Sequence, residues 1–176
     1  ERDSVELILT PDVLGILPGR FVGELRVINA ASGGAQTTSE PLVVDLPLAP
    51  PVVTGVSPLA ASRGQWIRVE GRGFVTADGL LQAAMLLVLE GQFTPRGGPP
   101  VSLTGPRALT LIPDLQVDNT LISTVLRVGR DGNGQLTGLG LLAGRFEGTI
   151  APWRFLGPDL VKGAAMPLTF DVLPAR

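Results

Sequence analysis

The chain has 176 residues, of which 44% are hydrophobic and 17% charged, and its formal net charge is −2. It contains neither histidine nor cysteine, which excludes disulfides, thiolate or His-ligated zinc sites, and Ser-His-Asp or Cys-His catalysis. The 14 basic residues are spread along the chain, which argues against a nucleic-acid partner, and no apolar run is long enough to predict a membrane span in this segment.

Short strands separated by turns are the predicted local structure throughout, because Gly (23) and Pro (16) stand singly between apolar runs. The chain begins at Glu1 without a signal peptide, and we interpret it as a fragment or a processed product. A strand is predicted near residues 5–9. In "RFVGELRVIN" (20–29), Phe21, Leu25 and Val27 alternate with mostly polar residues, which predicts a half-buried strand. "PLVVDL" (41–46) predicts another.

The segment "DLPLAPP" (45–51) is interpreted as a stiff connector between two domains. Pro47, Pro50 and Pro51 lack a backbone donor, so we expect neither a helix nor a sheet ladder to run through it. The predicted division is residues 1–48 and residues 49–176.

In the second part, "QWIRVEG" (65–71) predicts a strand with Ile67 and Val69 inward and Trp66 outward. Three further strands are predicted: "MLLVLEGQF" (85–93), "ALTLI" (108–112) and "TLISTVLRV" (120–128). The segments "SPLAASRG", "TPRGGPP" and "RDGNGQ" are rich in turn-forming residues and are predicted to lie between strands. The segment 76–91 is ambiguous, because a helical turn near 80–84 could precede the strand predicted from about Met85.

An internal repeat links the two parts. "LGILPGRFVGEL" (14–25) and "LGLLAGRFEGTI" (139–150) share seven identical residues at an offset of 125, and "PLVVD" (41–45) matches "PLTFD" (167–171) at an offset of 126. Composition alone explains such an in-register match poorly. We infer a duplication in which residues 1–50 are the C-terminal part of one copy and residues 51–176 are a complete copy.

The start of the complete copy, "PVVTGVSPLAASRGQWIRVEGRGF", resembles the start of an IPT/TIG domain, an immunoglobulin-like β-sandwich. The residues that carry the resemblance are Pro51, Val53, Val56, Ser57, Pro58, Gly64, Ile67, Val69, Gly71, Gly73 and Phe74. The resemblance implies an all-β fold, an immunoglobulin-like antiparallel β-sandwich in tandem repeats, the first one partial. We expect Pro58 to end the first strand, Gly64 to let the chain re-enter the sheet, and Phe74 to fold back over the end of the sandwich. The segment 76–138 matches the family poorly, and we interpret it as an insertion or an elaborated edge.

Trp66 and Trp153 are the candidate interface residues, together with Phe21, Leu25 and Val27 of the incomplete copy. An outward Trp is a suitable interface anchor or sugar-stacking platform. The alternative is that a loop or the adjoining domain covers it.

Catalytic and metal sites have little support. Glu70, Asp78 and Glu90 have no spacing that demands convergence, and Asp131 with Asn133 in "RDGNGQ" only partly resembles a calcium loop, since a closing Glu is missing. We therefore expect no cofactor and no enzyme activity.

The function expected is a non-catalytic structural or adhesive module of an exported bacterial protein at the cell surface or outside the cell, acting as a spacer or as an assembly unit, even of a filament. Its partners would be other repeats of the same protein or neighbouring subunits. The alternative is a carbohydrate- or protein-binding module appended to an extracellular enzyme, with a surface polysaccharide as ligand.

Overall fold

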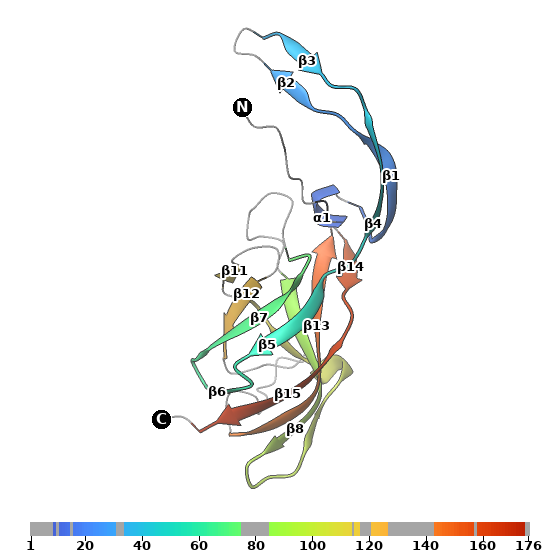
Figure 1. Ribbon diagram of the computed structural model, residues 1–176. Coiled ribbons are helices and arrows are strands. Elements are labelled where there is room, and N and C mark those ends of the chain that lie inside the picture. The colour runs from blue at the N-terminus through green and yellow to red at the C-terminus, as the bar shows by residue number, and fades with distance from the viewer. Residues whose placement is uncertain are drawn as a thin grey trace.

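A computed structural model of the chain consists mostly of β-strands (Figure 1). It describes residue 9 and residues 11–14, 16–30, 34–74, 85–113, 115–116, 121–126, 143–156 and 158–174. The helices in this part are one four-residue turn, α1 (Pro11–Leu14), and one 3-10 turn, η1 (Gly105–Arg107). No helix of the described residues has the length and apolar character needed to cross a membrane. The all-β class is therefore confirmed for the described chain.

The largest sheet has seven strands and is built around β13 (Gly144–Leu156). β8 (Met85–Pro95) pairs along one edge of β13, while β15 (Met166–Leu173) and then β14 (Asp159–Lys162) share the other edge. The remaining three strands pair side by side with these: β9 (Val101–Leu103) and β10 (Leu109–Leu111) pair with β8, and β6 (Ala60–Ser62) pairs with β15. All pairs are antiparallel except β6 with β15.

A second sheet has four strands in the order β11-β12-β7-β5. Their bounds are β5 (Val52–Ser57), β7 (Trp66–Arg72), β11 (Leu115–Gln116) and β12 (Leu121–Val125). β7 is buried at every second residue, as its alternation predicted, with Ile67 and Val69 inward and Trp66 outward.

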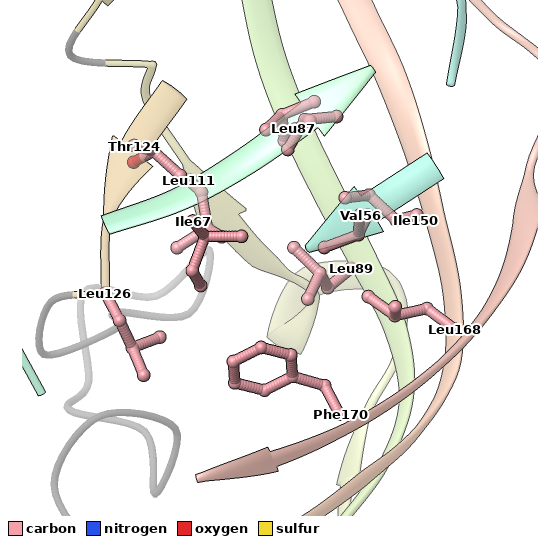
Figure 2. Close-up of a pocket in the computed structure, with 11 residues that line it drawn as sticks. Val56, Ile67, Leu87, Leu89, Leu111, Thr124, Leu126, Ile150, Leu168 and Phe170 are labelled. Atoms are coloured by element: carbon pink, nitrogen blue, oxygen red, sulfur yellow. The ribbon is translucent and has the colours of Figure 1, made fainter. Parts of the chain in front are cut away.

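The two larger sheets contribute to one hydrophobic core. Its buried members include Val69 of β7, Leu87 of β8, Ile150 of β13 and Phe170 of β15. Figure 2 shows the side chains of Leu87, Ile150 and Phe170 pointing into the space between the strands. Burial of each large apolar side chain contributes about 1.5–3 kcal/mol relative to exposure, so this shared core is the main source of stability in residues 51–174.

The turn chemistry predicted for the start of this region is confirmed. β5 ends at Ser57, immediately before Pro58, whose preceding peptide bond is cis. Gly64 re-enters the sheet with φ of 86°, in the left-handed region that favours glycine. Phe74 is fully buried, and its ring lies against the backbone of Gly71.

The N-terminal part forms two small sheets that stand apart from the larger ones (Figure 1). β1 (Gly19–Leu25) pairs with β4 (Leu42–Leu48), and β2 (Ile28–Ala30) pairs with β3 (Gln36–Thr38). The single strand predicted over 20–29 is therefore wrong, since it is split at Arg26 and Val27. The reason is a contact across the hairpin: the Val27 backbone N–H donates to the Ser39 side chain (3.0 Å) in place of a carbonyl, which interrupts the ladder.

Two further expectations are wrong. A sheet ladder does enter the connector, because Pro47 pairs with Arg20; a two-stranded sheet consists of edge strands, where proline is tolerated. The turn segment "SPLAASRG" contains the strand β6, which a purely local reading missed because its partner β15 lies at the other end of the chain. The predictions for residues 5–8, 76–84 and "RDGNGQ" concern residues outside the described part of the chain, while residue 9 of the strand predicted near 5–9 is described as non-strand.

Candidate interaction surfaces

The β1–β4 pair is the most unusual surface of the chain. The two strands pair over seven residues, from Gly19 opposite Leu48 to Leu25 opposite Leu42, and within the described residues no third strand joins them. A two-stranded sheet is marginally stable in water, because each strand keeps one edge of unpaired backbone groups. The outer edge of β1 thus carries no strand within the described part of the chain.

The two faces of this pair differ in exposure. Phe21 and Leu25 share a face, as predicted, and are half-buried with Val44 and Leu46 of β4. On the opposite face, Val22 (63% exposed) and Val43 (70%) lie open to solvent. Val27, the third residue predicted on the apolar face, lies beyond the end of β1 and is also exposed.

Oppositely charged side chains form pairs on the face that carries Val22 and Val43. Arg20 Nε donates to Asp45 Oδ1 (2.7 Å), and its Nη2 donates to Oδ2. Through this contact the guanidinium lowers the pKa of Asp45, and the carboxylate raises the pKa of Arg20. Next along β1, Glu24 accepts a hydrogen bond from Arg26 (2.9 Å).

The repeat-matched strands β13 and β15 form a similar antiparallel pair. β13 carries "GRFEG" where β1 carries "GRFVG", and Arg145 lies 3.8 Å from Asp171, the residues that match Arg20 and Asp45. The registers differ by two residues, an even shift that keeps the matched side chains on the same face.

The two pairs differ in what completes them. In the larger sheet, β8 pairs with the second edge of β13 and places Phe93 opposite Phe146, which in turn lies opposite Phe170. All three rings are buried. The corresponding edge of β1 has no strand on it within the described residues, and Phe21 is only half-buried.

Trp66 lies on the outer face of the four-stranded sheet and is 55% exposed. Its neighbours along β7 on that face are Arg68 and Glu70, whose Nε and Oε1 atoms are 3.3 Å apart. Neither a loop nor a strand of the described chain covers the indole. The predicted outward orientation is confirmed, and it leaves a flat apolar ring beside charged groups.

Trp153 belongs to a second aromatic surface, formed by β13 and β14. It is half-buried, with Lys162 Nζ 4.2 Å from its ring centroid, a cation–π contact. Two residues further on, Phe155 (51% exposed) lies opposite Leu160. Sequence reasoning missed Phe155 and Leu160; the signal was that "APWRFL" continues the alternation of "GRFEGTI" in phase.

Of the candidate acid and metal residues, the structure describes Glu70 and Glu90, and it places them on different sheets. Glu70 belongs to the four-stranded sheet, whereas Glu90 is on β8 of the seven-stranded sheet and accepts a hydrogen bond from the Gly105 backbone N–H (3.0 Å). Asp78, Asp131 and Asn133 lie outside the described residues. The part of the chain that the structure describes holds no group of three or more acidic residues placed to bind a metal ion.

A small cavity between the two larger sheets is a packing void and offers no room for a ligand. Its volume is about 20 Å³, and Figure 2 shows it lined by aliphatic and aromatic side chains with Thr124 as the one polar residue. The Thr124 hydroxyl donates to the Ile112 carbonyl (3.1 Å). An apolar cavity of this size remains dry.

No protein-family model and no curated protein matches this chain. The surfaces are therefore interpreted from their own chemistry.

Proposed function

We propose that this chain is a non-catalytic structural or adhesive module of an exported bacterial protein, built from tandem immunoglobulin-like β-sandwich repeats of the IPT/TIG type. In this proposal residues 49–176 are one complete, elaborated repeat and residues 1–48 are the C-terminal part of the preceding one. The module would act as a spacer or assembly unit at the cell surface or outside the cell.

The observation that carries the proposal is the recurrence of one strand pair in two settings. β1–β4 and β13–β15 share their matched sequence, their antiparallel pairing and an Arg–Asp contact on the same face. Tandem repeat proteins place similar structural units next to one another along the chain, and a strand pair that recurs in matched sequence supports such an arrangement here. The common core of the two larger sheets supports the sandwich.

The alternative is a carbohydrate- or protein-binding module, and the exposure of Trp66 favours it. An indole open to solvent beside an Arg–Glu pair could stack on a sugar ring while the charged groups bind hydroxyls. Against this reading, the second indole, Trp153, is already engaged by Lys162.

A glycan array separates the two readings. The wild-type chain is compared with Trp66→Ala and Trp153→Ala at equal concentration, after circular dichroism has shown that all three are folded. The structural reading expects no saccharide signal that depends on either Trp. A signal lost in Trp66→Ala and retained in Trp153→Ala would establish the binding module instead.

A screen of esterase, glycosidase and protease substrates tests the non-catalytic part of the proposal. Background hydrolysis is expected throughout. Robust turnover that one point substitution abolishes would overturn it.

A further inference from the structure

We propose that the free edge of β1 is a self-complementary docking site, at which two copies of this chain pair antiparallel with Val22 of one opposite Val22 of the other. The resulting sheet would have the strand order β4-β1-β1-β4. The inference rests on the proposed assembly function and names its partner, a second copy of the chain.

Within the described residues, the backbone of β1 has one open edge. β1 has a neighbour only on its β4 side within the described residues, although its sequence match β13 has strands on both edges. An unpaired edge exposes N–H and C=O groups that another strand can satisfy. A second copy would turn two marginal two-stranded sheets into one sheet of four strands.

The sequence of β1 is complementary to itself about Val22. Antiparallel pairing centred there sets Arg20 opposite Glu24 and Phe21 opposite Gly23. Directly opposed residues point to the same face, so the apolar faces of both copies join. Gly23 has no side chain to displace the Phe21 ring, which already lies across it within each strand.

Charge complementarity selects this register over its neighbours. Arg20 and Glu24 have side chains that are 72% and 51% exposed, so both can reach across a strand interface. The contacts already present extend the pair into an alternating chain of charges, in which Asp45 binds Arg20 and Arg26 binds Glu24. Such opposed pairs contribute modestly and mainly fix register.

The neighbouring registers lose either the opposite-charge pairing or the match between apolar faces. Moving the centre to Gly23 sets Arg20 opposite Arg26, two like charges, and moving it to Phe21 sets Glu24 opposite Pro18. A pairing centred between two residues, such as Val22 and Gly23, would join the apolar face of one copy to the open face of the other. Pairing centred on Val22 therefore retains both the charge match and the apolar face.

The experiment uses cysteine cross-linking, for which the cysteine-free chain is well suited. In a Val22→Cys dimer the two cysteines would lie directly opposite each other. Their Cα atoms would be about 4.5–5.5 Å apart, a separation that a disulfide can span. Val43→Cys is the matched control, because Val43 is an equally exposed valine on β4, on the same face, but away from the dyad. Under mild oxidation we expect disulfide-linked dimers to form at least tenfold faster in Val22→Cys.

Charge rescue provides the second readout. Sedimentation of the 176-residue wild-type chain from roughly 1 μM to 1 mM should show a monomer–dimer equilibrium. Val22→Lys and Val22→Glu should each be monomeric alone, through like-charge repulsion at the dyad, and should dimerise when mixed. Val43→Lys should associate like the wild type.

Three results would overturn the proposal. The first is equal cross-linking rates for the two cysteine variants, and the second is a dimer that Val22→Lys leaves unchanged. The third is a wild-type chain that stays monomeric across the range, whether the β1 amides are protected from hydrogen exchange by another part of the chain or remain open for a strand of a different protein. A failed dimer with an unchanged glycan result would leave the structural-module proposal intact.

Discussion

Replacing Gly71 with alanine should destabilise the chain, because the "GRGF" exit of β7 is a close-packed corner. A Cβ atom at position 71 would lie 2.1 Å from the Val52 carbonyl oxygen and 2.3 Å from Cζ of Phe74. Both distances are far below van der Waals contact. One neighbour is backbone of the paired strand β5 and the other is a fully buried ring, so neither can move without disturbing the core.

The expected cost of Gly71→Ala is about 1–3 kcal/mol, the usual range for overpacking a tight site. The free energy of unfolding is measured by urea titration, with Trp fluorescence reporting on both larger sheets, since Trp66 is on β7 and Trp153 on β13. Gly98→Ala is the matched control, because its added Cβ would meet nothing closer than the Pro95 side chain at 3.5 Å. That variant should stay within about 0.5 kcal/mol of wild type.

The double variant Gly71→Ala/Phe74→Ala tests the cause. Phe74→Ala alone should cost about 3–5 kcal/mol through the lost ring and the cavity it leaves. Removal of the ring relieves one of the two clashes, so the double variant should cost less than the sum of the singles. A Gly71→Ala chain as stable as the Gly98→Ala control would refute the close-packed corner.

Three further outcomes are expected. Phe146→Ala should cost about 3–5 kcal/mol by urea titration, whereas Phe21→Ala at the matched, half-buried position should cost clearly less at concentrations where the chain is monomeric; equal losses would contradict the assigned burial. Asp45→Asn should slightly reduce the loss of unfolding free energy at acid pH. The lowered pKa of Asp45 gives wild type a stabilising contribution that is present above the unfolded-state pKa and lost as pH falls through the folded-state pKa. Parallel plots of unfolding free energy against pH for the two proteins would count against this contribution. Lys162→Met should lower the free energy of unfolding by about 0.5–1 kcal/mol and shift the fluorescence emission of Trp153, and an unchanged emission spectrum would argue against the cation–π contact.

Local pattern sufficed where the structural cause is itself local. The alternation of Ile67 and Val69 with outward Trp66 predicted the burial of β7, because successive side chains of any strand point to opposite faces. Gly64 and the Ser57–Pro58 corner were predictable for the same reason, since conformational freedom and its loss belong to single residues.

The features that the sequence did not reveal depend on partners far along the chain. β6 becomes a strand because β15, more than a hundred residues later, offers a parallel edge to Ala61. The Ser39 hydroxyl replaces a ladder acceptor at Val27, and this contact is set by the hairpin that brings the two residues together. Pro47 enters a ladder because β4 lies at an edge, a property of the sheet and not of the proline.

The two strands that contain "GRF" show that the same local sequence can be buried to different extents. Phe146 and Phe21 stand in matched sequence on matched strands, and local propensity treats them alike. Phe146 is buried because β8 supplies Phe93 on one side and β15 supplies Phe170 on the other, whereas Phe21 has only the β4 side filled within the described chain. The strand is thus encoded locally, but its burial is encoded by its neighbours. A strand with the sequence of a sheet centre gains its burial from strands on both edges, and within the described residues β1 has a strand on one edge alone. For that reason the β1 edge is the most informative place to test what this chain does.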